Sequence, residues 1–281
     1  MIRILADTST LYSVEEGKKN NIDISPLSVT INNKTYEEYE EIKPKEFIEI
    51  INEGHVPTSS QPPIGKVLEL YNKYKDDEII NITMADGLSG TYQSACAAKN
   101  ICENPDKITV INSRTLCGPH RYLVDLAVKL ASLDYQKEEI IEIIEEEIKT
   151  TQSFLIPNDF DFLVRGGRLS FLSGKIGAMI GLVPVVMASE DGKKLESFTK
   201  TRSYKKAVAK ICDYFNEKNI DDSYIIYVSH ALNEKLAKEA EKIIKERING
   251  VEVIINELSP AFITQGGPSC VSIQYIKKCC I

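Results

Sequence analysis

Residues 85–93, Ala-Asp-Gly-Leu-Ser-Gly-Thr-Tyr-Gln, place two glycines, a serine and a threonine between a strand-like run and a helical pattern. Gly87 and Gly90 permit a tight turn with exposed backbone N–H groups. A helix that begins near Thr91 offers free N–H donors and the positive end of its dipole, which suit a carboxylate or a phosphate. The segment therefore predicts an anion-binding site at Ser89, Gly90 and Thr91. The alternative is that Ser89 or Thr91 only caps the helix.

A second hydroxyl-rich segment, 57–63, contains Ser59 and Ser60 just before two prolines. Hydroxyl groups ahead of Pro and a helical pattern indicate a helix start, so capping is again the alternative. In an open parallel sheet, both helix starts would lie at the carboxyl ends of strands or in their loops, where such sheets bind ligands. We therefore expect Ser59 and Ser60 to join Ser89 in one site.

Two glycine pairs in the second half of the chain are further candidates. Arg168 follows Gly-Gly in the segment 165–170 and could bind an anionic head group through two parallel hydrogen bonds, although a solvated turn is the alternative. Gln265 and Gly267 lie in a Gly-Pro segment, 264–269, between two strand-like stretches. There the backbone or the Gln265 amide could approach a ligand, and an ordinary hairpin connection is the alternative.

Several enzyme signatures are missing from the chain. It has no GxSxG nucleophile elbow, no Walker A loop and no Rossmann GxGxxG. The seven cysteines have irregular spacing, and only three histidines occur, so we predict no metal site and reduced thiols. A Cys117–His120 pair is conceivable, whereas His230 at a strand end favours a structural role.

Composition narrows the function classes. The chain has 281 residues, a net charge of −7, 43% hydrophobic residues and no Trp. The acidic balance and the few aromatic rings argue against nucleic acid as a partner. No apolar run reaches the roughly 18 residues needed to span a bilayer, and the N-terminus lacks the pattern of a secretory signal. We therefore expect a cytoplasmic protein without stable membrane insertion.

The alternation of strand-like runs with helical patterns predicts an α/β protein with two domains. Residues 1–155 are expected to form a doubly wound, mostly parallel sheet domain with a small β-hairpin insertion at about 22–42. Residues 156–281, in which hairpins mix with helices, are expected to form a second α+β domain with a mixed sheet.

The ordered set of motifs resembles the DegV family, the bacterial fatty-acid-binding proteins. The resemblance runs along nearly the whole chain, and the string Leu-Ser-Gly-Thr-Tyr-Gln-Ser-Ala at 88–95 is its most specific part. The other motifs are Asp7-Thr8-Ser9, Pro26-Leu27, Ser59-Ser60-Gln61-Pro62, Gly166-Gly167-Arg168, and Lys200-Thr201-Arg202 before Lys205-Lys206-Ala207.

This resemblance implies that one long-chain fatty acid is held in a tunnel between the two domains, with no other cofactor. The apolar stretch 174–188 is then a candidate for part of the tunnel wall, and plain core is the alternative. It implies that a separate fatty acid kinase subunit phosphorylates the bound carboxylate and that the chain itself is not catalytic. Carried over by position, the head-group ligands would come from the set Ser59, Ser60, Ser89, Gly90, Thr91, Arg168, Gln265 and Gly267. The family's C-terminal turn commonly carries His where this chain has Gln265, which donates a hydrogen bond but cannot become cationic.

The leading hypothesis is therefore a fatty-acid carrier. The alternative from another class is an enzyme that acts on a small carboxylate or phosphate substrate and uses Ser89 as nucleophile or phosphate binder. A nucleic-acid-binding regulator is the least favoured, because of the −7 net charge and the few aromatic residues.

Overall fold

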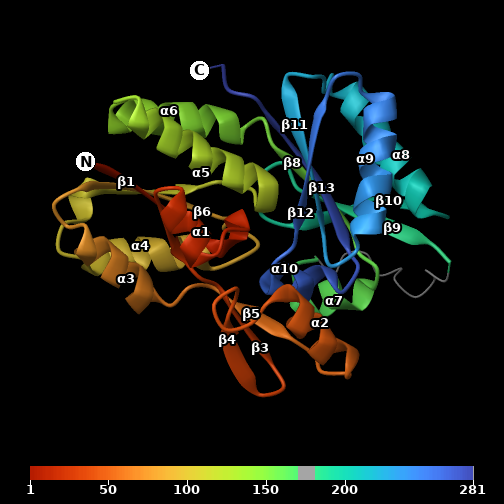
Figure 1. Cartoon of the computed structure of the whole chain (residues 1–281), viewed down its shortest axis with the longest axis horizontal. Coiled ribbons are helices and arrows are strands. Elements are labelled where there is room, and N and C mark those ends of the chain that lie inside the picture. The colour runs from red at the N-terminus through yellow and green to blue at the C-terminus, as the bar shows by residue number, and fades with distance from the viewer. Residues whose placement is uncertain (170–180, 281) are drawn as a thin grey trace. The chain divides into compact units, whose positions relative to one another are not determined.

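The computed structural model describes residues 1–169 and 181–280, which form two compact units (Figure 1). Unit 1 comprises Met1–Lys149 with Ser259–Ala261, and unit 2 comprises Thr150–Leu258 with Phe262–Ile281. The units divide after Lys149 rather than at 155, because strand β8 (Gln152–Ile156) pairs with β9 (Val183–Ala188) and β13 (Val271–Lys277) in the second sheet. The segment 259–261 returns to unit 1 from a distant part of the sequence.

Unit 1 is built on a parallel sheet of four strands in the order β2-β1-β6-β7. Its strands are short apolar runs buried on both faces, as parallel strands usually are. Helices α3 and α4 cover one face, and α5 and α6 cover the other (Figure 1), which confirms the predicted doubly wound fold. The strands are β1 (Ile2–Asp7), β2 (Ile22–Ser25), β6 (Glu78–Thr83) and β7 (Ile108–Asn112).

The helices of unit 1 are amphipathic, as α6 shows by burying Ile140, Ile144 and Ile148 at a spacing of four residues. The helices are α1 (Val14–Lys19), α3 (Ile64–Lys73), α4 (Thr91–Ile101), α5 (Cys117–Ser132) and α6 (Lys137–Ile148), with short 3-10 turns η1 (Thr8–Thr10) and η2 (Pro105–Lys107).

The strand order creates a switch point between β1 and β6. From β1 the chain moves outward to β2, and it later returns on the other side of β1 to build β6 and then β7. Open α/β sheets bind ligands beside the carboxyl ends of the strands at such a point. At this place the Met84 N–H, just after β6, donates to Asp7 Oδ2 at the end of β1 over 3.0 Å.

A small antiparallel sheet, β4-β3-β5, also belongs to unit 1. Strands β3 (Ser28–Ile31) and β4 (Lys34–Glu37) form the predicted hairpin, turned by Asn32 and Asn33 with φ of 50° and 59°. The insertion does not begin at 22 as predicted, because Ile22–Ser25 is strand β2 of the main sheet. It extends beyond 42 instead, through α2 (Pro44–Asn52) to β5 (Thr58–Ser60), which pairs with β3.

Unit 2 contains a sheet of six strands in the order β10-β9-β8-β13-β11-β12. The sheet has both parallel and antiparallel pairs, so it is the mixed sheet that the sequence predicted. Helices α8 (Tyr204–Glu217) and α9 (Glu234–Arg247) pack on one face over a large apolar core (Figure 1). Phe154 lies at its centre and contacts the rings of Tyr214 and Phe215 edge to face. The remaining elements are α7 (Phe160–Gly166), β10 (Leu195–Thr201), β11 (Tyr224–His230), β12 (Glu252–Glu257) and α10 (Pro260–Gly266), whose first two residues belong to unit 1.

Only part of the apolar stretch 174–188 lies in the described residues. The first part of the predicted tunnel wall, 174–180, lies outside the described residues, and its last part, 183–188, is strand β9. Within the described part of the chain, no helix combines the length and the hydropathy needed to cross a bilayer.

Candidate functional site

The loop from Ala85 to Gly90 joins β6 to α4 and places Ser89 at the start of the helix. The N-cap of α4 is Gly90, which has no side chain to cap the helix. The Ser89 Oγ accepts from the Thr91 N–H over 3.3 Å and lies 2.8 Å from Thr91 Oγ1. The two hydroxyl groups therefore lie together at the positive end of an eleven-residue helix, where they suit an anionic group.

The segment after β5 approaches this helix start. A methyl group built on Gly90 would lie 3.1–3.2 Å from the Gln61 side-chain amide, so Gln61 packs directly on Gly90. The structure thus brings the end of β5, with Ser59 and Ser60, next to the start of α4. The alternative, that these serines cap a helix, is excluded: Ser59 and Ser60 pair in β5 with Val29 and Ser28 of β3, and Pro63 is the N-cap of α3.

Unit 2 brings Arg168 and Gln265 into a second cluster. The Arg168 Nη1 donates to the Gly166 carbonyl, and a methyl group built on Gly166 would lie 1.9 Å from Gln265 Oε1. Gln265 therefore packs directly against the Gly-Gly-Arg segment. The alternative of an ordinary hairpin connection at 264–269 is excluded, because residues up to Gly266 complete helix α10.

Gly267 follows α10 and turns the chain. Its φ of +79° lies in the left-handed region, and a methyl group built on it would lie 2.8 Å from Phe162 Cδ2. Its N–H donates to the Ile263 carbonyl over 2.8 Å, which closes the last turn of the helix. Gly267 therefore fixes the end of α10 next to Gln265, and its backbone leaves no space for a side chain.

A buried polar network lies at the switch point, among residues that the sequence did not mark as a site. Asp7 accepts hydrogen bonds from the Ser9 and Met84 N–H groups, and Ser9 Oγ lies 2.6 Å from His120 Nδ1. The Ile82 carbonyl can only accept, so His120 Nε2, at 2.9 Å, carries the proton and Ser9 donates to Nδ1. Burial lowers the pKa of His120, which agrees with this neutral form. The partners of His120 are thus Ser9 and Ile82 rather than Cys117.

Glu38 extends this network. Its side chain is fully buried and accepts hydrogen bonds from Thr8 Oγ1 and from the Ala261 N–H, the latter over 2.9 Å. The Thr8 hydroxyl in turn accepts from the Leu27 N–H over 3.0 Å. Burial raises the pKa of Glu38 to about 7 against the effect of these hydrogen bonds. In the sequence Glu38 is only a carboxylate close to a predicted hairpin. Nothing in the sequence indicated that it would accept a hydrogen bond from residue 261.

Side chains that commonly bind metals are scattered in the part of the chain that the structure describes. No group of three or more His, Cys, Asp or Glu side chains is placed there to hold an ion. The seven cysteines are free thiols, and three of them, Cys117, Cys212 and Cys270, are buried.

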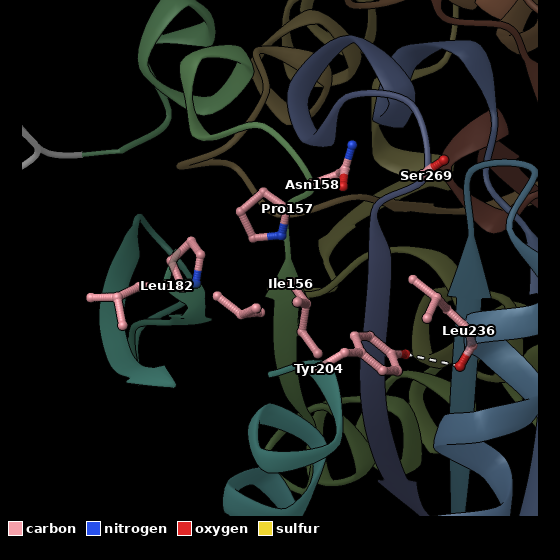
Figure 2. Close-up of a pocket in the computed structure, with 9 residues that line it drawn as sticks. Ile156, Pro157, Asn158, Leu182, Tyr204, Leu236 and Ser269 are labelled. Atoms are coloured by element: carbon pink, nitrogen blue, oxygen red, sulfur yellow. Dashed lines mark hydrogen bonds between the residues drawn. The ribbon is translucent and has the colours of Figure 1, made fainter. Parts of the chain in front are cut away.

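A hollow of about 140 Å³ lies in unit 2 beside the carboxyl end of β8 (Figure 2). Its lining mixes apolar side chains with polar ones, and the Tyr204 hydroxyl donates to the Leu236 carbonyl over 3.0 Å. Small-molecule pockets usually measure about 300–1,000 Å³, so this hollow alone is too small for a whole long acyl chain. The lining includes Ile156, Asn158, Leu182, Val183, Leu236 and Ser269.

Comparison with known proteins places the chain in a family. A family model described as an uncharacterised protein of the DegV family matches residues 1–278. A DegV domain-containing protein from Caldanaerobacter subterraneus subsp. tengcongensis is 29% identical, over 99% of this chain and 100% of that protein.

Two solved structures have the same fold over almost their whole length. One is DegV from Bacillus subtilis, described as a fatty acid binding protein, with a TM-score of 0.85, 28% identity and 99% coverage of both chains. The other is a DegV family protein from Eubacterium eligens loaded with heptadecanoic acid, with a TM-score of 0.86, 22% identity, and coverage of 99% of this chain and 100% of that chain. Together with the family model, which extends over nearly all of the sequence, these similarities establish that the chain belongs to the DegV family.

Proposed function

We propose that this protein binds one long-chain fatty acid and presents its carboxylate to a kinase. The observation that carries the proposal is the pair of hydroxyls, Ser89 and Thr91, at the N-terminus of α4 beside the sheet's switch point. The relative from Bacillus subtilis, described as a fatty acid binding protein, supports the choice of a lipid over other carboxylates.

In this proposal the head group is recognised by hydroxyl and amide donors and by one cation. Ser59, Ser60, Ser89 and Thr91 would supply hydroxyl groups, and the backbone of Gly90 would allow a close approach. Arg168 would supply a planar, charged donor, and its guanidinium can bind both oxygens of a carboxylate at once. Gln265 and the backbone at Gly267 would add neutral donors.

The acyl chain would supply most of the affinity. Burying about 15 methylenes at about 0.8 kcal/mol each contributes on the order of 12 kcal/mol before the costs of association. The tunnel between the two domains that the family resemblance implies is part of this proposal, and residues 183–188 are candidates for its wall. The polar groups then mainly decide which end of the lipid lies where.

The second step of the proposed function is the phosphorylation of the bound carboxylate. A carboxylate oxygen of the bound fatty acid would attack the γ-phosphorus of a nucleoside triphosphate held by the kinase subunit. The diphosphate would leave, and an acyl phosphate would remain on the carrier. The present chain would orient the carboxylate and exclude water from it, while the partner would supply the nucleotide.

Denaturing mass spectrometry of the purified protein tests the binding step. We expect a co-purified acid of long chain, and added palmitate or oleate should raise the melting temperature of the delipidated protein. The absence of both would refute lipid binding. Phosphorylation of the bound acid by a candidate kinase subunit and nucleoside triphosphate, but not by either alone, tests presentation separately.

The geometry at Ser89 favours binding over nucleophilic catalysis. The hydroxyl lies 2.8 Å from Thr91 Oγ1, and a second hydroxyl cannot take its proton at neutral pH as a histidine would. The enzyme hypothesis predicts turnover on acyl or phosphoryl substrates without a partner protein, and Ser89→Ala should abolish that turnover. Absence of turnover over a broad substrate panel would count against the enzyme.

A further inference from the structure

Three polar side chains of unit 2 form one row across three neighbouring strands. Ser229 of β11 lies directly opposite Ser272 of β13 on one side and opposite Asn256 of β12 on the other. Residues in register on adjacent strands point to the same face of a sheet. The row is therefore a single feature, assembled from segments far apart in the sequence.

The row lies on the face of the sheet away from α8 and α9. The residues that flank it along the strands, such as Val228, Val271 and Ile273, belong to the apolar core under those two helices. Because side chains alternate along a strand, Ser229 and Ser272 point to the opposite face. Both are nonetheless buried, with 0% and 8% of their surface exposed.

Burial leaves these groups with unmet hydrogen bonds. Ser229 Oγ, Ser272 Oγ and Asn256 Nδ2 are all buried atoms, and none has a hydrogen-bond partner among residues 1–169 and 181–280. Buried polar groups in native proteins are almost always hydrogen-bonded to protein or to ordered water. Three such atoms in one row call for a common explanation.

The spacing of the row matches single water molecules. Opposite side chains on adjacent strands have Cβ atoms about 4.5–5.5 Å apart. Two hydroxyls can bond directly across such a pair, as Thr30 and Thr35 do over 2.8 Å, but the hydroxyls of Ser229 and Ser272 lie without a partner in the described residues. A water molecule that makes two hydrogen bonds of about 2.8 Å spans such a gap. It also accepts from an amide N–H while it donates to or accepts from a hydroxyl.

We propose that Ser272, Ser229 and Asn256 form a buried site that binds two water molecules, one in each gap between neighbouring strands. Water is preferred over an anion because two hydroxyls and an amide carry no positive charge to offset the desolvation of an ion. The inference is independent of lipid binding, since it uses only the sheet of unit 2.

The site lies next to the Arg168–Gln265 cluster. Ser272 is opposite Leu155 of β8, and Leu155 Cδ1 would lie 3.5 Å from a methyl group built on Gly266 in α10. Leu155 also packs against the small apolar cluster of Leu163 and Leu169. The two waters would thus hold three strands in register beside the turn of α10 that carries Gln265.

A high-resolution crystal structure of the full chain tests the proposal directly. We expect one ordered water within about 3.2 Å of both Ser229 Oγ and Ser272 Oγ, and a second between Ser229 Oγ and Asn256 Nδ2. Direct side-chain pairing without water would overturn the proposal. An anomalous peak in the row after a bromide soak would also overturn it, in favour of an anion site.

The sign of a stability change gives an independent test. If water satisfies the hydroxyl, Ser229→Ala removes a hydrogen bond and should lower the melting temperature by about 2–4 °C. If the hydroxyl is unsatisfied, its removal should leave the melting temperature unchanged or raise it, which would contradict the proposal. Ser197→Ala, on the exposed strand β10, is the matched control and should shift it by less than about 1 °C.

Discussion

The carboxylate of Glu38 accepts a hydrogen bond from the backbone N–H of Ala261, 223 residues further along the chain, over 2.9 Å. The same carboxylate accepts a hydrogen bond from the Thr8 hydroxyl, which follows β1. Glu38 therefore links three parts of unit 1 by hydrogen bonds: the hairpin insertion, the switch point of the sheet and the segment 259–261. Breaking a buried network of this kind is costly, because each lost partner leaves a buried polar group unsatisfied.

Glu38 should make the stability of the protein depend on pH. Burial raises its pKa to about 7 in the folded protein from an ordinary value of 4.5, so folding favours the protonated form. Its stabilising contribution is therefore complete below about pH 4.5 and is lost as the pH rises through about 7. Between pH 5 and pH 8 we expect this group to lower the free energy of unfolding by about 3 kcal/mol at most.

Glu38→Gln tests this expectation by chemical denaturation across that pH range. The amide cannot ionise but still presents an oxygen to the Ala261 N–H, so the decline above pH 6 should become shallower than in the wild type. Glu142→Gln, on the exposed side of α6, is the control and should leave the profile unchanged. An identical decline in the wild type and in Glu38→Gln would show that another group titrates.

Removing the Ser89 hydroxyl should weaken fatty-acid binding by about tenfold, since a hydrogen bond to a charged group contributes about 1.5–3 kcal/mol. Most of the affinity should remain, because the acyl chain supplies the larger share. Titration of delipidated Ser89→Ala with a fluorescent long-chain acid measures the effect. Ser132→Ala, at the exposed end of α5, is the control, and equal affinities in the two variants would place the head group elsewhere.

Arg168 should confer the preference for an anionic head group. In Arg168→Lys the planar, two-point donor is lost while the charge is kept, so we expect an affinity for a long-chain acid about tenfold lower. The affinity for the fatty alcohol of equal length should change little. The comparison of acid with alcohol, measured by calorimetry, separates head-group recognition from a general loss of structure.

Arg165→Lys is the matched control for Arg168. Its guanidinium lies 4.8 Å from the centre of the Phe162 ring, in the same short segment. We expect the ratio of acid to alcohol affinity to stay at the wild-type value in this variant. If Arg165→Lys lowers the ratio as much as Arg168→Lys does, the assignment of Arg168 is wrong.

Gly267→Ala should destabilise the protein more than a glycine substitution at another positive-φ position. A methyl group at Gly267 meets both an unfavourable φ of +79° and the Phe162 ring at 2.8 Å. Gly54 has a φ of +98°, but none of the residues that the structure describes comes within 4 Å of the added methyl group. We expect a loss of about 1 kcal/mol for Gly54→Ala and about 2–4 kcal/mol for Gly267→Ala in urea unfolding. Equal losses would mean that the Phe162 ring moves aside freely.

The sequence predicted those parts of the fold that depend on local pattern. Helix α6 and strand β6 follow from the spacing of isoleucines, and the β3–β4 hairpin follows from Asn32 and Asn33, which tolerate positive φ. The helix start that the hydroxyls of Ser59 and Ser60 before Pro indicated does not form at these residues, because pairing with β3 decides their conformation. Such pairing depends on residues some 30 positions away and leaves no local signal.

Some residues of the candidate site could be recognised from local sequence, and others could not. The glycine and hydroxyl segment at Ser89 was visible because a strand, a turn and a helix follow one another in the sequence. Ser9 and Glu38 were not visible, and His120 was considered only with Cys117, because each of these residues gains its partner only through the tertiary fold. Long-range polar contacts of this kind have no spacing rule that a single sequence could reveal.

The return of Ser259–Ala261 to unit 1 has a consequence for protein engineering. The chain leaves that unit after Lys149 and contributes to it once more before it continues in the other. A fragment that stops at 149 would retain Glu38 but lack the N–H that its carboxylate binds. Cutting the gene at the apparent domain boundary should therefore give an incomplete folding unit, and a fragment to which residues 259–261 are joined through a linker should be the better minimal domain.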